Sequence, residues 1–134
     1  MSPPSSHPPE QSWQTDYKKA QQEAKTNNKL LLLNFTGSDW CGWCIKLHKE
    51  VFSQPEFAAY AKKNLVLVEV DFPKRKEQTA DLKKANQALS EKYKIEGYPT
   101  IIVLNGEGDQ VGKLDYMNSP KPFIAKLDEL KKKS

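Results

Sequence analysis

The stretch Phe35-Thr-Gly-Ser-Asp-Trp-Cys41-Gly-Trp-Cys44 decides the fold, because it holds both cysteines of this 134-residue chain directly after the apolar run 30–35. The thiolate is the nucleophile in disulfide exchange, so such chemistry needs a group that stabilises negative sulfur. A helix that begins at Cys41 supplies this through unpaired backbone N–H groups and the positive end of its dipole. Cys44, one turn later, can close a disulfide or resolve a mixed one. The stretch therefore predicts a strand, a short loop and a helix that opens on a redox-active pair.

Three other interpretations of the cysteine pair are weaker. A structural zinc site usually takes four nitrogen or sulfur ligands, and only His7 and His48 could add to the pair. Two inert buried thiols fit poorly with the polar neighbours Ser38 and Asp39. A purely structural disulfide would close almost no loop and so would constrain the unfolded chain little. We therefore expect redox chemistry that needs no metal and no cofactor other than the cysteine pair.

Length and charge limit the class of protein. A chain of this size can bury one core, so we expect one domain at 12–134 after a disordered Pro/Ser-rich linker at 1–11. The 21 basic and 17 acidic residues give a net charge of +4, with basic runs of three at 74–76 and 131–133. Neither run has an aromatic cluster on which bases could stack, so we expect no nucleic-acid partner. No apolar run approaches the roughly 20 residues that cross a bilayer.

The first half of the chain alternates helix and strand. Ser12 is a candidate N-cap for a helix over 13–27, with Trp13, Tyr17, Ala20 and Ala24 on one face. The run 29–35 is nearly all apolar, as in a strand that is buried on both faces.

The segment after the cysteines predicts two consecutive helices. Spacing places Cys44, Leu47, His48 and Val51 on one side of the first. The sequence 53–56, Ser-Gln-Pro-Glu, is a capping-box pattern with proline in the first turn, which indicates a break after Phe52 and a second helix over 55–63.

The second half adds three strands and two helices. The run 64–72 is mostly apolar and predicts a second core strand, in which the three valines point to one face, and a charged loop follows at 73–77. Further elements are a helix over 78–93, strands over 100–104 and 110–114, and a helix after Ser119-Pro120 with Phe123, Leu127 and Leu130 inward. The inner face of helix 78–93 comprises Leu82, Ala85, Leu89 and Tyr93. The order α-β-α-α-β-α-β-β-α predicts an α/β fold with helices on both faces of a mixed sheet.

Two motifs together resemble the thioredoxin superfamily. Trp40-Cys41-Gly42-Trp43-Cys44 is similar to its W-C-x-x-C site, and Gly97-Tyr98-Pro99-Thr100 looks like its cis-proline segment before an antiparallel strand. With the run Val68-Glu-Val-Asp-Phe-Pro73, the pattern is similar to extracytoplasmic DsbH-type disulfide oxidoreductases over about residues 13 to 131. The resemblance implies a thioredoxin fold, in which a four-stranded mixed sheet has the cysteine-bearing strand at its centre.

The resemblance also implies roles at the site. Cys41 is expected to attack as the more exposed sulfur, and Cys44 to resolve the mixed disulfide as the more buried one. Trp40 and Trp43 are interpreted as exposed, substrate-facing rings. In family members the backbone beside the proline that matches Pro99 pairs with an extended substrate, and Tyr98 belongs to the same segment.

The site departs from thioredoxins in its proton-handling groups. Thioredoxins carry a buried aspartate on the central strand, but the matching region here is Asn34-Phe35, and asparagine cannot take a proton. The lysine that accompanies that aspartate is also missing, which leaves Glu69 as the candidate on the neighbouring strand. His48 is a second candidate modulator, four residues after Cys44. Asp39 is interpreted as a helix cap or a surface residue.

These features predict a monomeric thiol–disulfide oxidoreductase that acts on protein disulfides and needs an upstream thiol reductant, possibly membrane-bound. With Gly42-Trp43 between the cysteines, no histidine stabilises the thiolate, which favours a reducing couple and hence a reductase or isomerase. We expect a periplasmic or secreted protein, although the start shown has neither a basic n-region nor an apolar h-region. The alternatives are a cytoplasmic thioredoxin-like reductase and a thioredoxin-fold binding module without turnover.

Overall fold

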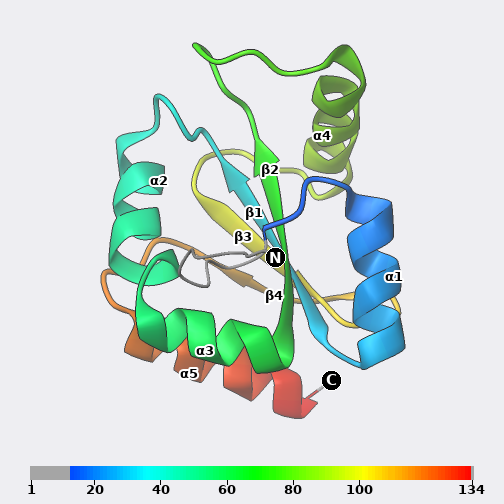
Figure 1. Ribbon diagram of the computed structural model, residues 1–134, viewed down its shortest axis with the longest axis vertical. Helices are drawn as coiled ribbons and strands as arrows, with labels where there is room; N and C mark the ends of the chain where they lie inside the picture. Colours follow the sequence, from blue (N-terminus) through cyan, green and yellow to red (C-terminus); the bar gives the residue numbers. More distant parts are fainter. Residues whose placement is uncertain (1–12, 134) are drawn as a thin grey trace, which may run out of the picture.

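The computed structural model describes residues 13–133, so the predicted linker 1–11 and the predicted N-cap Ser12 lie outside the described residues. Figure 1 labels the elements. In chain order they are α1 (Tyr17–Asn27), β1 (Leu30–Thr36), α2 (Gly42–Leu47), η1 (His48–Phe52), α3 (Pro55–Asn64), β2 (Leu65–Asp71), α4 (Ala80–Lys92), β3 (Thr100–Leu104), β4 (Gln110–Leu114) and α5 (Pro120–Lys133).

The four strands form one mixed sheet in the order β2-β1-β3-β4. β1 pairs with β2 in parallel and with β3 antiparallel, and β4 forms the antiparallel edge. Every residue of β1 is buried, as its apolar sequence predicts for a strand covered on both faces. The predicted thioredoxin fold and the central position of the cysteine-bearing strand are therefore confirmed.

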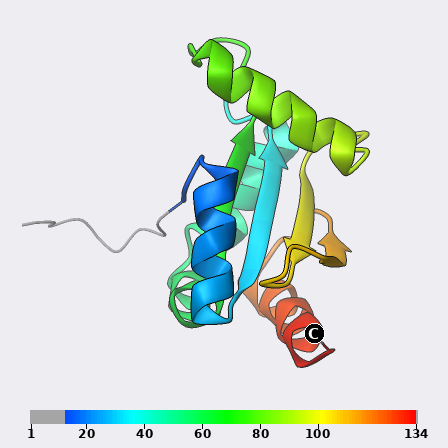
Figure 2. The ribbon, with the colours of Figure 1, turned by 90° about the vertical axis from the view of Figure 1, so that its right-hand side faces the viewer.

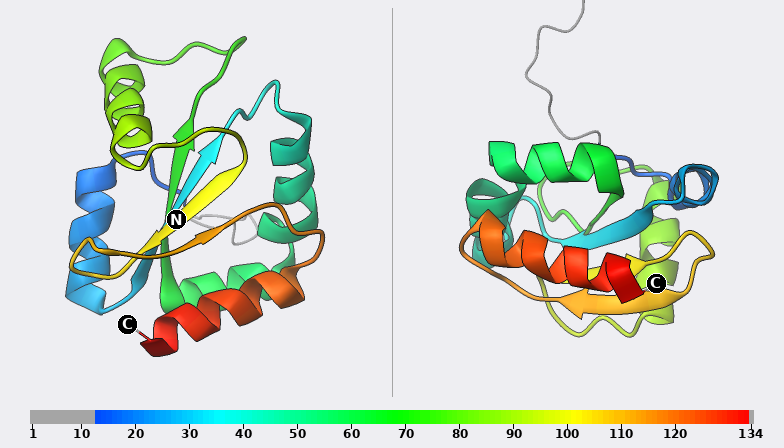
Figure 3. Two further views of the ribbon diagram at one scale, coloured as in Figure 1. Left: turned by 180° about the vertical axis from the view of Figure 1, so that it is seen from behind. Right: turned by 90° about the horizontal axis from the view of Figure 1, so that it is seen from below.

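Helices cover both faces of the sheet (Figure 1; Figure 3, right). α1 and α4 pack on one face, where the core includes Leu31, Leu33, Phe35, Val66, Val68, Val70 and Leu89. α2, η1, α3 and α5 pack on the other, around Leu32, Leu47, Phe52, Phe57, Leu67, Phe123 and Leu127. Alternate residues of β1 and β2 supply the two cores, because successive side chains of a strand point to opposite faces.

The start of the described chain differs from the predicted helix over 13–27. α1 begins only at Tyr17, where Asp16 is the N-cap and accepts a hydrogen bond from Lys19 N. Before it, Gln14 N donates to Leu67 O and Glu69 N to Gln14 O, so the chain runs along the open edge of β2 (Figure 2). This pairing gives hydrogen-bond partners to backbone groups at the edge of β2. Helical periodicity in the sequence cannot predict such a pairing, because it depends on a distant strand.

Trp13 and Tyr17 consequently lie on opposite faces of the sheet. Trp13 packs against Phe52, with ring centroids 5.1 Å apart. Tyr17 packs with the other core, where Ala20 and Ala24 of α1 are fully buried. The prediction that Trp13 shares the inner face of α1 was wrong.

The break predicted after Phe52 is present, but its cap is different. α2 continues into the π-helical turn η1, in which Ser53 N donates to His48 O. α3 then begins at Pro55 with Gln54 as the N-cap, and no capping-box side-chain hydrogen bond forms. The wider turn places Val51 and Phe52 in the core and leaves His48 exposed, so His48 does not share the buried side of Cys44 and Leu47.

The inner face of α4 matches the prediction at Leu89, and Tyr93 just after the helix packs against the same core, but the prediction was wrong for Ala85. The helix begins at Ala80, after the N-cap Thr79, and buries Asn86 and Leu89, whereas Ala85 is exposed. The Asn86 side chain donates to Asp71 O at 3.0 Å. Burial of a polar side chain is tolerated here because the amide is hydrogen-bonded, and this tertiary contact sets the rotation of the helix.

The remaining elements follow their predicted bounds closely. β3 and β4 match them residue for residue, and Phe123 and Leu127 of α5 are buried while Leu130 is half-buried against the same core. Among residues 13–133, no helix has the length and apolar character that crossing a membrane requires.

Candidate functional site

The cysteine pair lies at the start of α2, just after the loop that follows β1. Cys41 is the N-cap of α2, with extended backbone, and its Sγ accepts a hydrogen bond from Cys44 N at 3.2 Å. The two residues form a disulfide. Cys41 and Cys44 are 7% and 5% exposed, so the predicted difference in burial between the two is absent in this oxidised state. The predicted helix start at the pair is confirmed, and it directs backbone N–H donors at the first sulfur.

Trp40 is fixed beside Cys41 and is half-buried, not exposed as predicted. Its Nε1 donates to Phe72 O at 2.7 Å. Its ring also lies against Gly37, where a Cβ would fall well inside van der Waals contact. Gly37 is therefore needed so that the rigid ring can approach the backbone, and the indole connects the loop after β1 to the loop after β2.

The proline segment lies against the same ring. The Tyr98–Pro99 peptide bond is cis. The Tyr98 ring packs edge-on against Trp40 at 5.7 Å and tilted against Phe72 at 5.5 Å. The fold thus brings together Trp40, Tyr98 and Pro99, which lie about 60 residues apart in the sequence.

Trp43 lies on the other side of Cys41 in the chain and is exposed, as predicted, at 57%. Its ring packs edge-on against Tyr116, with centroids 5.0 Å apart. Tyr116 lies between β4 and α5, and its hydroxyl donates to the Glu50 carboxylate. Trp43 is therefore a supported surface ring, held by a residue to which the sequence gave no signal.

Two carboxylates hold the loop that carries Cys41. The buried Asp71, at the end of β2, accepts hydrogen bonds from the backbone and hydroxyl of Ser38 and pairs with Lys76 at 3.1 Å. Asp39 accepts from the backbone N–H groups of Lys74, Arg75 and Lys76 at 2.8–2.9 Å. Hydrogen bonds from the Lys74 and Lys76 N–H groups, with a smaller contribution from Arg75, lower the Asp39 pKa from 3.8 to about 2.

Asp39 is not the N-cap of α2, which is Cys41, so the first of its two predicted roles was wrong. It is a half-exposed surface residue, as the second prediction had it, but its carboxylate is bound by backbone N–H groups. Its carboxylate organises the segment 74–76, whose basic residues the sequence presents only as a charged loop. The run Val68 to Pro73 could have drawn attention to Asp71 and Phe72, but periodicity alone does not say which loop they meet.

Asn34 and Glu69 are direct partners in the β1–β2 register and point to the face covered by α2. Asn34 is buried, and its Oδ1 has no hydrogen-bond partner among residues 13–133. Burial raises the pKa of the Glu69 carboxyl, as does nearby Asp71, while Lys76 and His48 act in the opposite direction. Glu69 is therefore turned toward the α2 layer, and the exposed His48 acts on it only through its charge.

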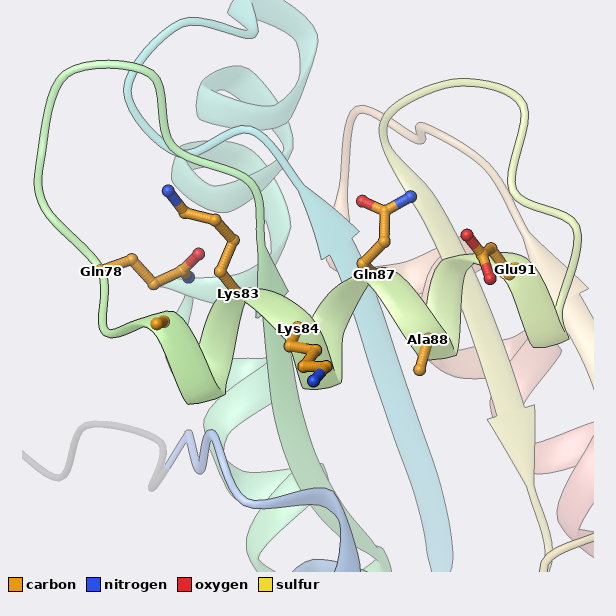
Figure 4. Close-up of a pocket in the computed structure, with 7 residues that line it drawn as sticks. Gln78, Lys83, Lys84, Gln87, Ala88 and Glu91 are labelled. Atoms are coloured by element: carbon orange, nitrogen blue, oxygen red, sulfur yellow. The ribbon is translucent and has the colours of Figure 1, made fainter.

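Figure 4 shows a surface hollow along α4 that is lined by Gln78, Ala80, Lys83, Lys84, Gln87, Ala88 and Glu91. It lies on the opposite face of the sheet from α2, and its lining contains neither cysteine nor histidine. Within residues 13–133, no group of three His, Cys, Asp or Glu side chains is arranged to hold a metal ion.

Comparisons with known proteins agree with the fold and the cysteine pair. A family model described as a thioredoxin-like domain matches residues 17–131. The chain is 36% identical over 104 residues to the disulfide bond reductase DsbH of Chlamydia pneumoniae. The matched region covers 78% of this chain and 62% of that protein. It is 37% identical over 102 residues to the thioredoxin-related protein DsbJ of the same organism. Here the matched region covers 76% of this chain and 29% of that protein.

A solved structure of a DsbH oxidoreductase superposes with a TM-score of 0.86 at 32% identity and covers 92% of this chain and 85% of that chain. The chain spans less than two thirds of the full length of either Chlamydia relative.

Replacing Asp39 with Asn should destabilise the protein in a pH-dependent way. Because the folded-state pKa of Asp39 is lowered, its stabilising contribution is fully present above about pH 4 and is lost as pH falls through about 2. Asp39→Asn should therefore lower Tm at pH 6, and this difference from wild type should shrink toward pH 2. The exposed Asp115→Asn serves as the control. A difference in Tm that does not change with pH would contradict the assignment.

Proposed function

The chain belongs to the thioredoxin-like family, and on this premise we propose that it is a thiol–disulfide oxidoreductase that reduces or isomerises disulfides in protein substrates. The observation that carries the proposal is the Cys41–Cys44 disulfide at the start of α2, beside the segment that contains the cis Tyr98–Pro99 bond. Its similarity to a disulfide bond reductase and to a DsbH oxidoreductase supports the same chemistry.

The proposed reduction proceeds in two exchanges. The Cys41 thiolate attacks one sulfur of the substrate disulfide, forms a mixed disulfide and releases the other substrate sulfur as a thiolate. Cys44, once deprotonated, attacks Cys41 Sγ, closes the Cys41–Cys44 disulfide and releases the second substrate thiolate. The substrate gains two electrons, which the protein loses. An upstream thiol reductant must then return the pair to the dithiol form.

The position of each sulfur supports its role. Cys41 caps the helix and accepts the Cys44 N–H, so its thiolate is stabilised by an oriented donor and by the helix dipole. Cys44 lies within the first turn, where it can reach Cys41 but has no cap position of its own. The proposed substrate-binding surface consists of Trp40, Trp43, Tyr98 and Pro99.

We assign proton transfer at Cys44 to Glu69. Asn34 lies on the central strand, in the region that matches the buried aspartate of thioredoxins, but it has no ionisable group. Its partner on the neighbouring strand, Glu69, faces the α2 layer. The raised pKa of the Glu69 carboxyl brings it closer to that of a thiol, which improves it as a base in the resolving step. His48, which is exposed, modulates the charge on Glu69.

The residues between the cysteines support the proposed direction of electron flow. Gly42 has no side chain, and the Trp43 ring packs against Tyr116, so neither residue supplies the imidazole donor that a histidine between the cysteines would. A thiolate with fewer donors favours the disulfide form, which makes the couple reducing. The monomeric state, the extracytoplasmic location and a membrane-bound electron donor remain predictions from the sequence resemblance, with the cytoplasm and a binding module as alternatives.

The reduction potential of the Cys41–Cys44 couple should lie near about −270 mV, in the range of thioredoxin. Equilibration with glutathione or thioredoxin and quantification of the thiols would measure it. Trp43→His, which places a donor between the cysteines, should raise the potential by about 30 mV or more. Gly42→Ala is the matched control, because its Cβ meets open space and adds no donor. A wild-type value near about −120 mV would make the protein a disulfide donor instead.

Cys44→Ala should accumulate a stoichiometric mixed disulfide with a disulfide-containing substrate, because the attacking sulfur remains and the resolving sulfur is gone. Mass spectrometry under non-reducing conditions would detect the adduct. Cys41→Ala is the matched control and should accumulate far less adduct. If the adduct formed equally well through Cys44, the proposed roles of the two cysteines would be reversed. If neither variant formed an adduct while the double variant kept all cellular function, a binding module would be supported.

Glu69→Gln should slow resolution of the mixed disulfide by about 10²-fold, the low end of general-base effects. Stopped-flow measurement of the step against pH should show a rise with ionisation of Glu69, above the usual pKa of a glutamate, that the variant lacks. The exposed Glu91→Gln on α4 is the control. An unchanged pH profile in Glu69→Gln would sink this assignment.

A further inference from the structure

Two exposed lysines lie over aromatic rings on either side of the cysteine pair in the chain. Lys74 Nζ is 4.2 Å from the centroid of the Trp40 ring. Lys46 Nζ is 5.2 Å from the centroid of the Trp43 ring and 5.8 Å from that of Tyr116. A cation over a ring is attracted by the negative π-face, so the ring contact restricts the conformations of each lysine side chain and holds its ammonium near the cysteines.

The supports under these lysines are themselves fixed. Trp40 is anchored by its hydrogen bond to Phe72 O, and the Lys74 backbone by its hydrogen bond to Asp39. On the other side, Trp43 and Lys46 share the first turns of α2, and Tyr116 is held by Glu50. Both positive charges therefore have a defined place before any substrate arrives.

The acidic groups near the pair are engaged by hydrogen-bond donors or face the α2 layer, and Glu50 accepts a hydrogen bond from the Tyr116 hydroxyl. Asp39 is committed to three backbone N–H groups, and the buried Asp71 to Ser38 and Lys76. Glu69 faces the α2 layer. Among the described residues, by contrast, Lys46, Lys74 and Arg75 are exposed cations near the cysteines with no carboxylate within ion-pair distance.

The same surface exposes apolar area. Trp43 and Ile45, 57% and 50% exposed, are the large apolar side chains that the described chain leaves open to solvent. Both lie in the first turns of α2, next to the disulfide. Exposed apolar side chains rimmed by charge mark a protein-binding surface, and a rigid tryptophan is a typical anchor in such interfaces.

We propose that Lys46 and Lys74 select protein substrates in which acidic residues flank the disulfide, while Trp43 and Ile45 supply apolar contact. This inference rests on the proposed function and adds the substrate class. A carboxylate near the substrate cysteine meets an ammonium whose ring contact leaves its outer N–H groups free. Attraction of this kind mainly accelerates encounter, and salt screens it.

Three disulfide peptides of identical length would test the proposal, with Glu, Gln or Lys beside each cysteine. The second-order rate of their reduction by the reduced protein should be about tenfold higher for the Glu peptide than for the Lys peptide at low ionic strength. This ratio should approach one as ionic strength rises toward about 0.5 M, where the screening length falls to a few ångströms.

The matched variants separate local charge from net charge. Lys46→Gln/Lys74→Gln should lower the Glu-to-Lys rate ratio at least threefold. Lys62→Gln/Lys84→Gln, with exposed lysines on α3 and α4, removes the same charge and should keep the ratio. Circular dichroism and Tm would verify that both variants are folded. A ratio near one in wild type, or an equal fall in both variants, would overturn the inference. Failure of wild type to reduce even the Gln peptide would overturn the proposed function instead.

Discussion

Complete burial of β1 is the constraint on which the rest of the structure depends. All seven residues of this strand are covered, by α1 and α4 on one face and by α2, η1, α3 and α5 on the other. Each fully buried leucine contributes about 2 kcal/mol, so the run 30–33 strongly disfavours any register that would expose it. Because the strand is fixed, Gly37 and the following loop lie at one end of the sheet, and the cysteines lie at the start of α2.

Burial alone would leave that loop free, and polar contacts remove this freedom. Asp71, Asp39 and the Trp40 indole each cross between the loops after β1 and β2, and each uses a strong hydrogen bond. Because β1 and β2 are parallel, their carboxyl ends meet at the same edge, and these contacts join residues more than 30 positions apart. The tryptophan beside Cys41 thus serves both as support for the site and as part of its surface.

The distribution of charge distinguishes this site from thioredoxin. The central strand carries Asn34, and the neighbouring strand carries the carboxyl of Glu69, so the ionisable group on the α2 side of the sheet lies one strand away from the position of the aspartate that the resemblance to thioredoxins implies. The outer surface carries lysines on aromatic rings, whereas the carboxylates around it are occupied by hydrogen bonds. The Glu69 carboxyl faces inward and the lysine cations face outward. This arrangement agrees with the proposal that Glu69 handles protons while the lysines contact the substrate.

The sequence by itself determined the fold class, the bounds of β3 and β4 and the helix start at the cysteine pair, because hydrophobic period and cap chemistry are local properties. It failed for Trp13 and Ala85, it did not predict the hydrogen bonds of Asp39, and it gave no signal for Tyr116. Each of these depends on a partner far along the chain: the open edge of β2, the Asp71 carbonyl, the amides of 74–76 and the Trp43 ring. Only the tertiary structure decides such contacts, since a side chain that can pair in several ways takes the partner that packing brings within reach.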